Sequence, residues 1–537
     1  MKTRYFLREQ ANGFENEIKA AAEIIKNGGL VAVPTETVYG LAANALMPDA
    51  VKRIFEVKGR PQDNPLIVHV AKPEHVYLFA KEISPLAKKA IKAFMPGPFT
   101  AVLPKQSVIP SVTTAGLDSV AIRCPSHEIM NKIISASGVP IAAPSANISG
   151  LPSPTCFEHC LKDLNGKIEG IVDGGSSEFG VESTVVSFLS DKAVICRPGA
   201  ITKEMLVNLL GEENVIDLSE DKSERPVSPG MKYRHYSPSI PLYTVTGEKA
   251  EEYIKQRCEN ENGIAVMSYK EDRKKYNTLH FFEFGERGKP ETQAASLFAA
   301  LRAADDKKDE ISLILSVAPE NKKEGAAVLN RLNKAASQKK IHLVKNPTVI
   351  GVTGKSGSGK STVSKEIANR LGYFYIDCDL LANDIIWNFP PLTERIKKEF
   401  AVSSRKELSE KVFSSPDLLE RLNFLTLPVI ISEIHKVIHH NASLGVKGFI
   451  IDGATIIESK VSVFLSALVF VKCDEETAIN RIIKRDNISR EIAVRRIKSQ
   501  KPDEFYKKEA DITLATDCEL ELSVKNLINE LQLKGIE

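Results

Sequence analysis

One glycine-rich segment has the residue types and the spacing of a phosphate-binding loop. Residues 354–361 read GKSGSGKS and match the pattern G-x-x-x-x-G-K-S/T, between an expected strand and an expected helix. In such a loop the glycines let backbone N–H groups turn toward phosphates, the lysine reaches the β and γ phosphates, and the last hydroxyl can hold Mg²⁺. The segment therefore predicts a nucleoside triphosphate site, the alternative being a glycine-rich turn without a nucleotide.

Two aspartates follow this loop at alternate positions. Asp377 and Asp379 close the next expected strand, which would place both carboxylates on one face near the loop. One could take a proton from a hydroxyl group while the other orients a metal ion or the substrate. The alternative is that they cap the helix that begins there.

Basic residues crowd two expected helices farther along the chain: Arg481, Lys484, Arg485, Arg495, Arg496 and Lys498. Such runs are usually solvated faces, but in small kinases they form a lid over the transferred phosphoryl group.

Several polar residues follow apolar strands between residues 30 and 200. Lys58 and Arg60 are two positions apart, so in an extended segment both side chains project to one side. This arrangement suits a polyphosphate site, and it suits a solvated edge equally well. Arg123 and Arg197 end apolar strands, where a buried carboxylate or a phosphate could be the partner. His69 lies in an apolar strand, where a histidine is more often a core residue than a ligand.

Three groups of elements would position these residues in an α/β multidomain fold. Residues 1–210 alternate short strands and helices, and residues 211–240 are rich in Pro, Ser and charge, which predicts a linker. Residues 241–345 alternate strands with longer helices, which predicts a small Rossmann-like domain with a parallel sheet. A third α/β domain, over 347–537, opens with a strand at 348–353 and a helix at 360–371.

Length and charge limit the possible functions. A chain of 537 residues is long enough for three or four domains. The 72 basic and 69 acidic side chains give a net charge of +3, which argues against a polybasic nucleic-acid-binding surface but allows local phosphate pockets. The sequence shows neither a signal-peptide core nor an apolar run of membrane-spanning length, and its eight cysteines form no CxxC pair. We expect a soluble cytoplasmic protein.

The third domain resembles dephospho-CoA kinase over nearly all of 348–530. The resemblance rests on the phosphate loop, the D-x-D at 377 and 379, the segment 452–458, and the stretches 484–486 and 496–500. It implies Asp379 as the base on a ribose 3′-hydroxyl, Ser361 as the Mg²⁺ ligand, and ATP contacts from Gly354, Ser356, Gly357, Ser358, Gly359, Lys360, Ser361, Thr362 and Arg485.

The acceptor side of this domain departs from the family. Asn383 stands where the family usually has Arg or His, Leu427 replaces the His of its His-Pro pair, Ala454 replaces a Pro, and Thr516 replaces an Asn. The residues expected to bind ATP match the family, whereas the residues expected to bind the acceptor do not. We therefore expect this domain to bind ATP, and phosphorylation of dephospho-CoA is a further expectation that depends on the altered side.

Residues 1 to about 345 resemble the long, two-domain branch of the YrdC-like threonylcarbamoyl-AMP synthases. The motifs are PTETVYGLA at 34–42, KGRPQDNPL at 58–66, SVAIRCP at 119–125, Ser145-Ala146-Asn147, GVESTVV at 180–186, RPGAI at 197–201, SPGMKYRHYSP at 228–238 and NRLNKAA at 330–336. The resemblance implies that L-threonine, bicarbonate and ATP give threonylcarbamoyl-AMP and pyrophosphate, the precursor of a tRNA modification.

The same resemblance implies roles for individual residues. Lys58 and Arg60 would be catalytic, and threonine would be held by Thr35, His69, Arg123, Ala143 and Ser183. ATP would be held by Arg60, Asn64, Ser119, Ser145, Asn147, Ser153, Arg197 and Tyr236, with Mg²⁺ accompanying it. Because Tyr236 lies in the linker, we expect residues 228–238 to fold over the pocket as a lid that excludes water from a labile product.

The leading interpretation is an enzyme with both activities, a nucleotidyltransferase fused to a phosphotransferase. Its expected partners are ATP, L-threonine, bicarbonate, dephospho-CoA and the downstream proteins that transfer threonylcarbamoyl to tRNA, without direct nucleic-acid binding and without a membrane. One alternative makes residues 347–537 a nucleotide-binding regulatory module without turnover or a kinase of another acceptor. Another makes the first domain a non-catalytic module for double-stranded RNA.

Overall fold

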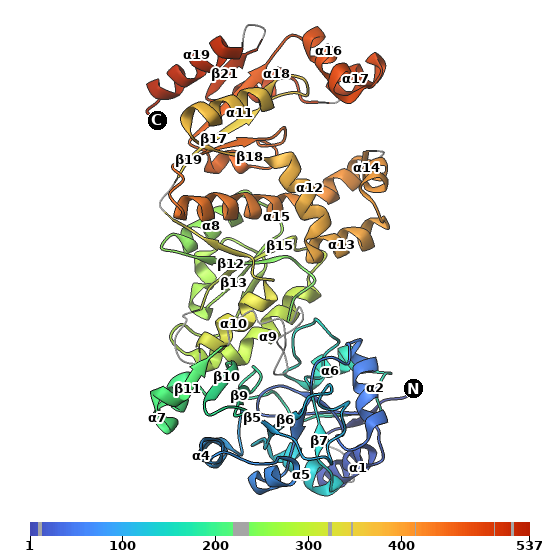
Figure 1. Ribbon diagram of the computed structural model, residues 1–537. Helices are drawn as coiled ribbons and strands as arrows, with labels where there is room; N and C mark the ends of the chain where they lie inside the picture. The colour runs from blue at the N-terminus through green and yellow to red at the C-terminus, as the bar shows by residue number, and fades with distance from the viewer. Residues whose placement is uncertain are drawn as a thin grey trace.

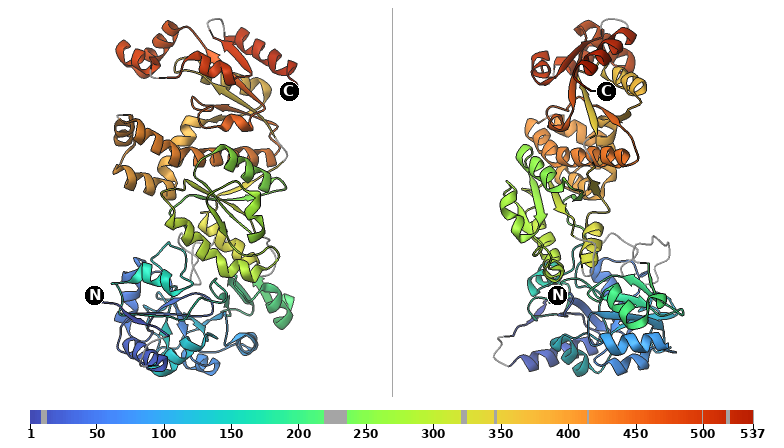
Figure 2. Two further views of the ribbon diagram at one scale, coloured as in Figure 1. Left: turned by 180° about the vertical axis from the view of Figure 1, so that it is seen from behind. Right: turned by 90° about the vertical axis from the view of Figure 1, so that its left-hand side faces the viewer.

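The computed structural model describes residues 1–8, 13–218, 236–319, 325–344, 347–413, 415–498, 500–516 and 520–536. These residues form three α/β units, each built around its own sheet and stacked along the long axis of the molecule (Figure 1). The chain begins in the unit at one end and finishes in the unit at the other (Figure 2). No helix in this part of the chain is long and apolar enough to cross a membrane. The predicted α/β multidomain fold is confirmed.

The first unit is a mixed sheet with helices on both faces. Its strand order is β1-β8-β2-β3-β7-β4-β6-β5-β9-β10-β11. The strands are β1 (Arg4–Phe6), β2 (Val31–Val33), β3 (Gly40–Asn44), β4 (Ile67–His69), β5 (Phe99–Pro104), β6 (Ser119–Arg123), β7 (Ile141–Ala142), β8 (Gly170–Val172), β9 (Thr184–Ser187), β10 (Ala193–Arg197) and β11 (Val215–Asp217). The helices are α1 (Phe14–Lys26), α2 (Pro48–Lys58), α3 (Val76–Phe79), α4 (Pro85–Phe94), α5 (Glu128–Ser137), α6 (Phe157–Leu164) and α7 (Lys203–Leu210), with 3₁₀ turns at Pro73–His75 and Glu212–Asn214.

The apolar strand β2 shows why both faces of this sheet are covered. Val31 and Val33 pack with α1 and α5 in one hydrophobic cluster, whereas Leu30 and Ala32 belong to the cluster on the opposite face. Because side chains alternate across a strand, an uninterrupted apolar run requires a cover on each side.

The expected linker at 211–240 contains a strand. β11 pairs in parallel with β10, and a 3₁₀ turn precedes it, so the first unit continues past residue 210. The expectation was wrong here because a three-residue edge strand needs no long apolar run. Residues 219–235, which include most of the predicted lid, lie outside the described residues.

The middle unit, which we call the accessory unit (residues 236–344), has the predicted parallel sheet. Its strand order is β14-β13-β15-β12-β16, with every neighbouring pair parallel. The elements are β12 (Leu242–Thr246), α8 (Ala250–Asn260), β13 (Ile264–Ser268), a 3₁₀ turn (Lys270–Lys275), β14 (Phe281–Glu283), α9 (Pro290–Asp306), β15 (Leu313–Val317), α10 (Gly325–Ala335) and β16 (Lys340–His342).

The third unit has a parallel sheet of order β18-β19-β17-β20-β21. Its strands are β17 (Thr348–Thr353), β18 (Phe374–Asp377), β19 (Gly448–Asp452), β20 (Ala467–Lys472) and β21 (Ile512–Ala515). Its helices are α11 (Lys360–Leu371), α12 (Cys378–Asn388), α13 (Pro390–Phe400), α14 (Arg405–Phe413), α15 (Pro416–Ser443), α16 (Glu475–Asp486), α17 (Arg490–Lys498), α18 (Asp503–Glu509) and α19 (Leu520–Leu533), with a 3₁₀ turn at Val461–Phe464. The central strand β17 and the helix α11 have the predicted bounds.

The long helix α15 lies between the accessory sheet and the third sheet (Figure 1). Apolar side chains of both units form one continuous hydrophobic cluster around it, with Ile254 and Leu315 on the accessory side and Leu425 and Val429 on α15. The two units therefore share a core instead of meeting at a polar surface.

Candidate active sites

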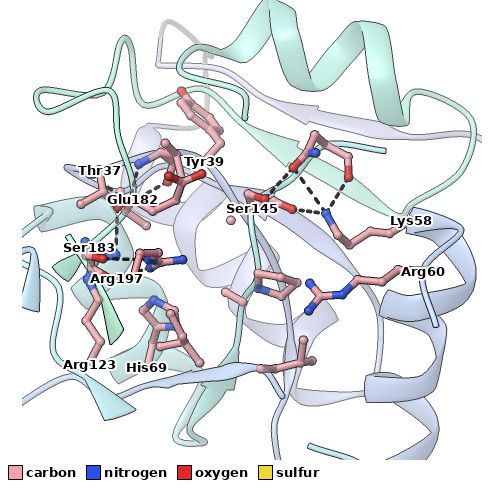
Figure 3. Close-up of a pocket in the computed structure, with 18 of the residues that line it drawn as sticks. Thr37, Tyr39, Lys58, Arg60, His69, Arg123, Ser145, Glu182, Ser183 and Arg197 are labelled. Carbon is pink, nitrogen blue, oxygen red and sulfur yellow. Dashed lines mark hydrogen bonds between the residues drawn. The ribbon is translucent and has the colours of Figure 1, made fainter. Parts of the chain in front are cut away.

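A pocket in the first unit lies at the carboxyl ends of several strands. β4 and β6 are parallel and in register at His69 and Arg123, so both side chains reach the same edge of the sheet. Figure 3 shows Lys58 and Arg60 on one side of this pocket and His69, Arg123 and Arg197 on the other. Its polar and aromatic lining consists of Thr35, Thr37, Tyr39, Lys58, Arg60, His69, Arg123, Ser145, Asn147, Ser149, Glu182, Ser183, Arg197 and Tyr236, and Ala143 also lines it.

Arg123 forms the charged centre of one end of this pocket. Its Nη2 lies 2.8 Å from Glu36 Oε1, and its Nη1 donates to Thr37 Oγ1 at 2.9 Å. Burial alone would raise the pKa of Glu36, but the charge and hydrogen bond of Arg123 outweigh it and hold that pKa below its usual value. Arg123 is thus fixed from behind by a carboxylate, and the pair is buried.

His69 is uncharged at this end of the pocket. Burial, with a smaller contribution from the Arg123 charge, lowers the pKa of His69 to about 3. Its Nδ1 is buried and has no hydrogen-bond partner among the described residues. A neutral imidazole with an unused nitrogen suits a small polar ligand better than an anionic one.

Lys58 is buried at the other end of the pocket. Its Nζ donates to the carbonyl oxygens of Ser145 at 2.5 Å and Asn147 at 2.6 Å. Burial, together with the charge of Arg60, lowers the pKa of Lys58 to about 7. Ser145 Oγ in turn donates to Asn147 Oδ1 at 2.5 Å. The predicted site residues Lys58 and Arg60 therefore share a pocket with Ser145 and Asn147, and Lys58 fixes the loop that carries the latter two.

Arg197 and Ser183 form the third wall of the pocket. Arg197 donates from Nε to the Ser183 carbonyl at 3.1 Å and from Nη2 to Ser183 Oγ at 3.1 Å. Thr35 belongs to the loop after β2, where its Oγ1 donates to the Val38 carbonyl at 2.7 Å. These contacts place residues from three separate motifs around one cavity.

Three residues predicted to bind nucleotide do not line the pocket. Ser153 is buried behind it and donates to Glu182 Oε1 at 2.7 Å. Asn64 precedes the lining residue Pro65, and within the described chain its buried side-chain amide has no hydrogen-bond partner. Ser119 opens β6 and is paired with Pro104. The remaining residues predicted to bind nucleotide line the pocket, whereas these three do not.

A second pocket surrounds the glycine-rich loop of the third unit, at the carboxyl end of the central strand β17. This edge is where ligands bind in open parallel sheets. Gly357 has φ +82° and would place a Cβ 2.5 Å from the Ala478 carbonyl, so only glycine fits there. The pocket is lined by Gly357, Gly359, Lys360, Ser361, Thr362, Val363, Arg481, Arg485, Thr516 and Leu520.

The remaining predicted loop residues support this pocket from outside it. Ser356 donates its backbone N–H to Gln500 Oε1 at 2.9 Å, and Arg485 Nη2 donates to Ser356 Oγ at 3.5 Å. Thr516 Oγ1 donates to the Ser358 carbonyl at 2.7 Å, so the residue that replaces the family's Asn is tied to the loop. Gly354 directly follows β17, and its space is limited by the Val471 carbonyl.

The two aspartates after β18 do not lie on one strand face as predicted. The strand ends at Asp377, whose Oδ1 accepts the backbone N–H groups of Asp379 at 3.1 Å and Leu380 at 3.0 Å. Asp379 is instead in the first turn of α12, near enough to Arg485 that its charge helps to raise the arginine pKa. Asp377 is thus a helix cap, because a carboxylate satisfies unpaired N–H groups at a helix start.

Another acidic residue, Asp452 at the end of β19, lies beside the glycine-rich loop. Burial raises the pKa of Asp452, while its hydrogen bond with Ser361 and the charge of Lys360 oppose that shift. Its Oδ1 is buried without a hydrogen-bond partner in the described part of the chain, and Tyr375 donates to its Oδ2 at 3.0 Å. A carboxylate and a hydroxyl side by side, with an unused oxygen, suit Mg²⁺.

Comparison with known proteins identifies each part of the chain. Residues 23–199 match the family model described as "Telomere recombination", 201–337 match "Threonylcarbamoyl-AMP synthase, C-terminal domain", and 348–521 match "Dephospho-CoA kinase". The threonylcarbamoyl-AMP synthase of Pyrococcus abyssi is 46% identical over 336 residues, which are 61% of this chain and 96% of the relative. The chain belongs to the threonylcarbamoyl-AMP synthase family. A Bacillus subtilis synthase is 43% identical over 347 residues, covering 64% of this chain and all of that protein.

A solved synthase structure agrees with this assignment. The crystal structure of P. abyssi Sua5 complexed with L-threonine matches with a TM-score of 0.59 and 42% identity, covering 64% of this chain and 100% of that one. The first unit and the accessory unit therefore make up the synthase, and the third unit is a dephospho-CoA kinase domain added to it. The expected pair of enzyme families is confirmed.

Sequence reasoning missed two acidic residues of the synthase pocket. Glu36 pairs with Arg123, and Glu182 contacts Ser153. Both lie inside the motif blocks PTETVYGLA and GVESTVV, so the signal was present. It was overlooked because a phosphate site directs attention to cations, whereas a buried cation requires an anionic partner.

The departures of the kinase domain lie along its acceptor side. Asn383 is in α12, and Leu427 and Pro428 are in α15, the helix against the accessory unit. Ala454 follows β19, where its carbonyl accepts a hydrogen bond from Thr353 Oγ1 at 3.4 Å. Asn383, Leu427 and Ala454 thus belong to helices and loops away from the lining of the glycine-rich loop pocket, whereas the fourth altered position, Thr516, lines it.

Proposed function

We propose that this chain carries out two ATP-dependent reactions: synthesis of threonylcarbamoyl-AMP in the first unit and phosphorylation of the ribose 3′-hydroxyl of dephospho-CoA in the third. The observation that supports the first is the single pocket in which Lys58, Arg60 and Arg197 meet the Arg123–Glu36 pair and neutral His69. One end suits an amino-acid carboxylate, and the other suits a polyphosphate.

In the proposed synthase reaction, bicarbonate or CO₂ first converts the threonine amine to a carbamate. A carbamate oxygen then attacks the α-phosphate of ATP, and pyrophosphate leaves with the electron pair of the broken P–O bond. Arg123 holds the threonine carboxylate, while Lys58, Arg60 and Arg197 offset the charge on the triphosphate. Ser145, Asn147 and Tyr236 complete the nucleotide side, and Asn64, Ser119 and Ser153, which do not line the pocket, are assigned to it as supporting residues. Positioning and electrostatics suffice, so no covalent enzyme intermediate is required.

The lid hypothesis remains part of this proposal. Tyr236, at the end of the predicted lid, lines the pocket and is 5% exposed. Its ring lies 5.0 Å from that of Phe298 in α9 of the accessory unit. A chain segment anchored there can cover the mixed anhydride product and limit its hydrolysis. The product would then pass to the proteins that transfer threonylcarbamoyl to tRNA.

The kinase proposal rests on the fit of the loop pocket to ATP. Lys360 would contact the β and γ phosphates, and Arg481 and Arg485 line the same pocket from α16. Ser361 and Asp452 would hold Mg²⁺, which offsets the charge of the phosphates when bound. Asp379 would accept the proton of the 3′-hydroxyl as its oxygen attacks the γ-phosphate and ADP leaves.

A regulatory nucleotide-binding module is the second candidate for the third unit. It is favoured by Leu427, which replaces the family's His, and by Pro428, whose carbonyl accepts a hydrogen bond from Arg257 of the accessory unit at 2.8 Å. In this version ATP binds at the loop without turnover. A kinase with another acceptor would share the loop and differ in α12 and α15.

Pyrophosphate release by the full chain tests the synthase proposal. The wild-type protein should release pyrophosphate only when threonine and bicarbonate are both present, and Lys58→Ala should abolish that release. Release that ignores threonine would contradict the proposal, and no release at all would favour the RNA-binding alternative. Lys360→Ala serves as the control, because it alters the other nucleotide site and should leave this reaction intact.

Conversion of dephospho-CoA to CoA by the full chain tests the kinase proposal. The wild-type protein should form CoA and ADP in equal amounts, and both Lys360→Ala and Asp379→Asn should stop this. ATP binding at the loop without any CoA or ADP would support the regulatory module. ADP formation from another acceptor would retain the kinase and reject dephospho-CoA. Lys58→Ala is the matched control, because it should leave CoA formation unchanged.

A further inference from the structure

Arg331 of the accessory unit reaches into the wall of the synthase pocket. It lies on α10 and is fully buried. Its Nε donates to Glu182 Oε2 at 3.1 Å and its Nη1 to the Pro198 carbonyl at 2.7 Å. One side chain of the accessory unit therefore connects the loop before β9, which carries Ser183, to the loop after β10, the strand that ends at Arg197.

Glu182 is the point at which the nucleotide side of the pocket converges. Its Oε1 accepts the hydrogen bond of Ser153. Burial alone would raise the pKa of Glu182, but the charges of Arg331 and then Arg197, with the hydrogen bond from Ser153, lower it to about 2. The same carboxylate interacts with the phenol of Tyr236. Three residues assigned to ATP thus share one ionised partner that does not itself suit an anionic ligand.

A buried carboxylate beside a triphosphate needs a cation of its own. Without Arg331, the cations left to interact with Glu182 would be Arg197, whose charge would then be taken from the phosphates, and Lys334 of α10. An unpaired buried carboxylate would also repel ATP or take up a proton. Arg331 meets this need from outside the pocket lining, because it contacts Glu182 from the accessory side.

We propose that Arg331 is a positioning residue of the synthase: it neutralises and orients Glu182, which Ser153 holds from behind, so that Arg197 and Tyr236 are presented to ATP. The accessory unit is then part of the nucleotide site and not only a neighbour of it. The ring of Phe298, which packs beside Tyr236, belongs to the same unit, so this contact also connects the accessory unit to the pocket. This inference rests on the ATP-binding role proposed above for the pocket.

The test compares Arg331→Gln with a matched break between the same two units. Arg302 of α9 forms an equally buried salt bridge with Asp163, at 2.7 Å, but does not line the pocket. In threonine-dependent pyrophosphate release, Arg331→Gln should raise the KM for ATP at least about tenfold more than Arg302→Gln does. The KM for threonine should change much less. Equal values of the KM for ATP in the two variants would overturn the proposal.

Charge removal separates positioning from a merely structural role. The double variant Glu182→Gln, Arg331→Gln has no unpaired carboxylate and should recover much of the ATP affinity that Arg331→Gln loses. Below pH 7, where Lys58 carries its charge in both proteins, the KM for ATP of Arg331→Gln should also improve as the pH falls and Glu182 takes up a proton, whereas that of the wild type should not. A double variant as poor as the single one, with a flat pH profile, would overturn the proposal.

Two further measurements keep the outcome interpretable. Arg331→Lys retains the charge, so it should keep a KM for ATP closer to wild type even if Arg331→Gln folds poorly; failure of this rescue would count against the proposal. The wild-type protein must show threonine-dependent release in the same assay. If it does not, the proposed function has failed, whereas active wild type with an unaffected Arg331→Gln contradicts only the role of Arg331.

Discussion

Arg257 of α8 donates a 2.8 Å hydrogen bond to the carbonyl of Pro428 in the middle of α15. The same guanidinium donates to Ser432 Oγ at 3.0 Å and to Glu261 Oε2 at 2.8 Å. Arg257 is fully buried, so the accessory unit and the kinase domain meet through a charge that has no access to water. This contact occupies the helix in which the kinase domain departs from its family.

Arg257→Met should destabilise the full chain by about 3 kcal/mol or more, because it leaves Glu261 buried without its counter-ion. The expected measurement is a lower unfolding midpoint in urea, seen by circular dichroism. Arg490→Met is the control, since Arg490 and Glu476 form an exposed ion pair, and such pairs contribute little to stability. Similar losses in the two variants would mean that the buried network contributes no more than a surface ion pair.

Lys58 should give the synthase a pH dependence. Burial, followed by the charge of Arg60, lowers the pKa of Lys58 to about 7, so the free enzyme loses this positive charge as the pH rises through that value. We therefore expect kcat/KM for ATP to decrease above pH 7, when it is measured as pyrophosphate release at saturating threonine. Any residual release by Lys58→Met should lack this decline. A wild-type profile that stays level to pH 9 would contradict the assignment.

The same shift has a consequence for stability, with a definite sign. Because the folded pKa of Lys58 lies below its unfolded value of 10.5, the unfolded chain binds more protons between about pH 7 and that value. The contribution of Lys58 to the free energy of unfolding should therefore become more favourable as the pH rises through this window. Comparing wild type with Lys58→Met at pH 6 and pH 9 isolates this contribution.

Gly357→Ala should remove ATP binding at the kinase domain while sparing the synthase. The added Cβ would lie 2.5 Å from the Ala478 carbonyl oxygen, and the alanine would have to keep the φ of +82° that Gly357 has. The loop must therefore move away from α16. Gly372→Ala is the matched control. It carries φ +65° with open space around it, and should cost only about 1 kcal/mol. The measurement is the ATP affinity of each glycine variant by calorimetry. Both variants also carry Lys58→Ala, so that the synthase site does not contribute to the signal.

The shared core around α15 should make the kinase domain depend on the accessory unit. A fragment of residues 347–537 exposes the apolar side of α15 that packs with Ile254 and Leu315, so it should bind a hydrophobic dye and unfold at a lower temperature than a fragment of 241–537. Identical melting curves for the two fragments would show that α15 repacks without its neighbour.

The regular elements of this fold could be predicted because they depend on local patterns. The strand and helix around the glycine-rich loop have the predicted bounds, since glycine spacing and apolar periodicity are both local. Asp379 was misplaced because the end of β18 depends on Asp377 capping the next helix, a preference that competes with strand alternation. The pairs Glu36–Arg123 and Glu182–Arg331 join residues 87 and 149 positions apart, and no local pattern can pair them.

The two largest fully buried side chains among the described residues are both arginines of the accessory unit, Arg257 and Arg331. One faces the kinase domain and the other faces the synthase pocket. A substitution in the accessory unit that preserves its contact with the kinase domain must therefore also preserve its contact with the synthase pocket. If the chain were divided at residue 346, the cut would expose the buried guanidinium of Arg257 on one side and the surface of α15 on the other, so separation of the two enzymes would require compensating changes on both sides.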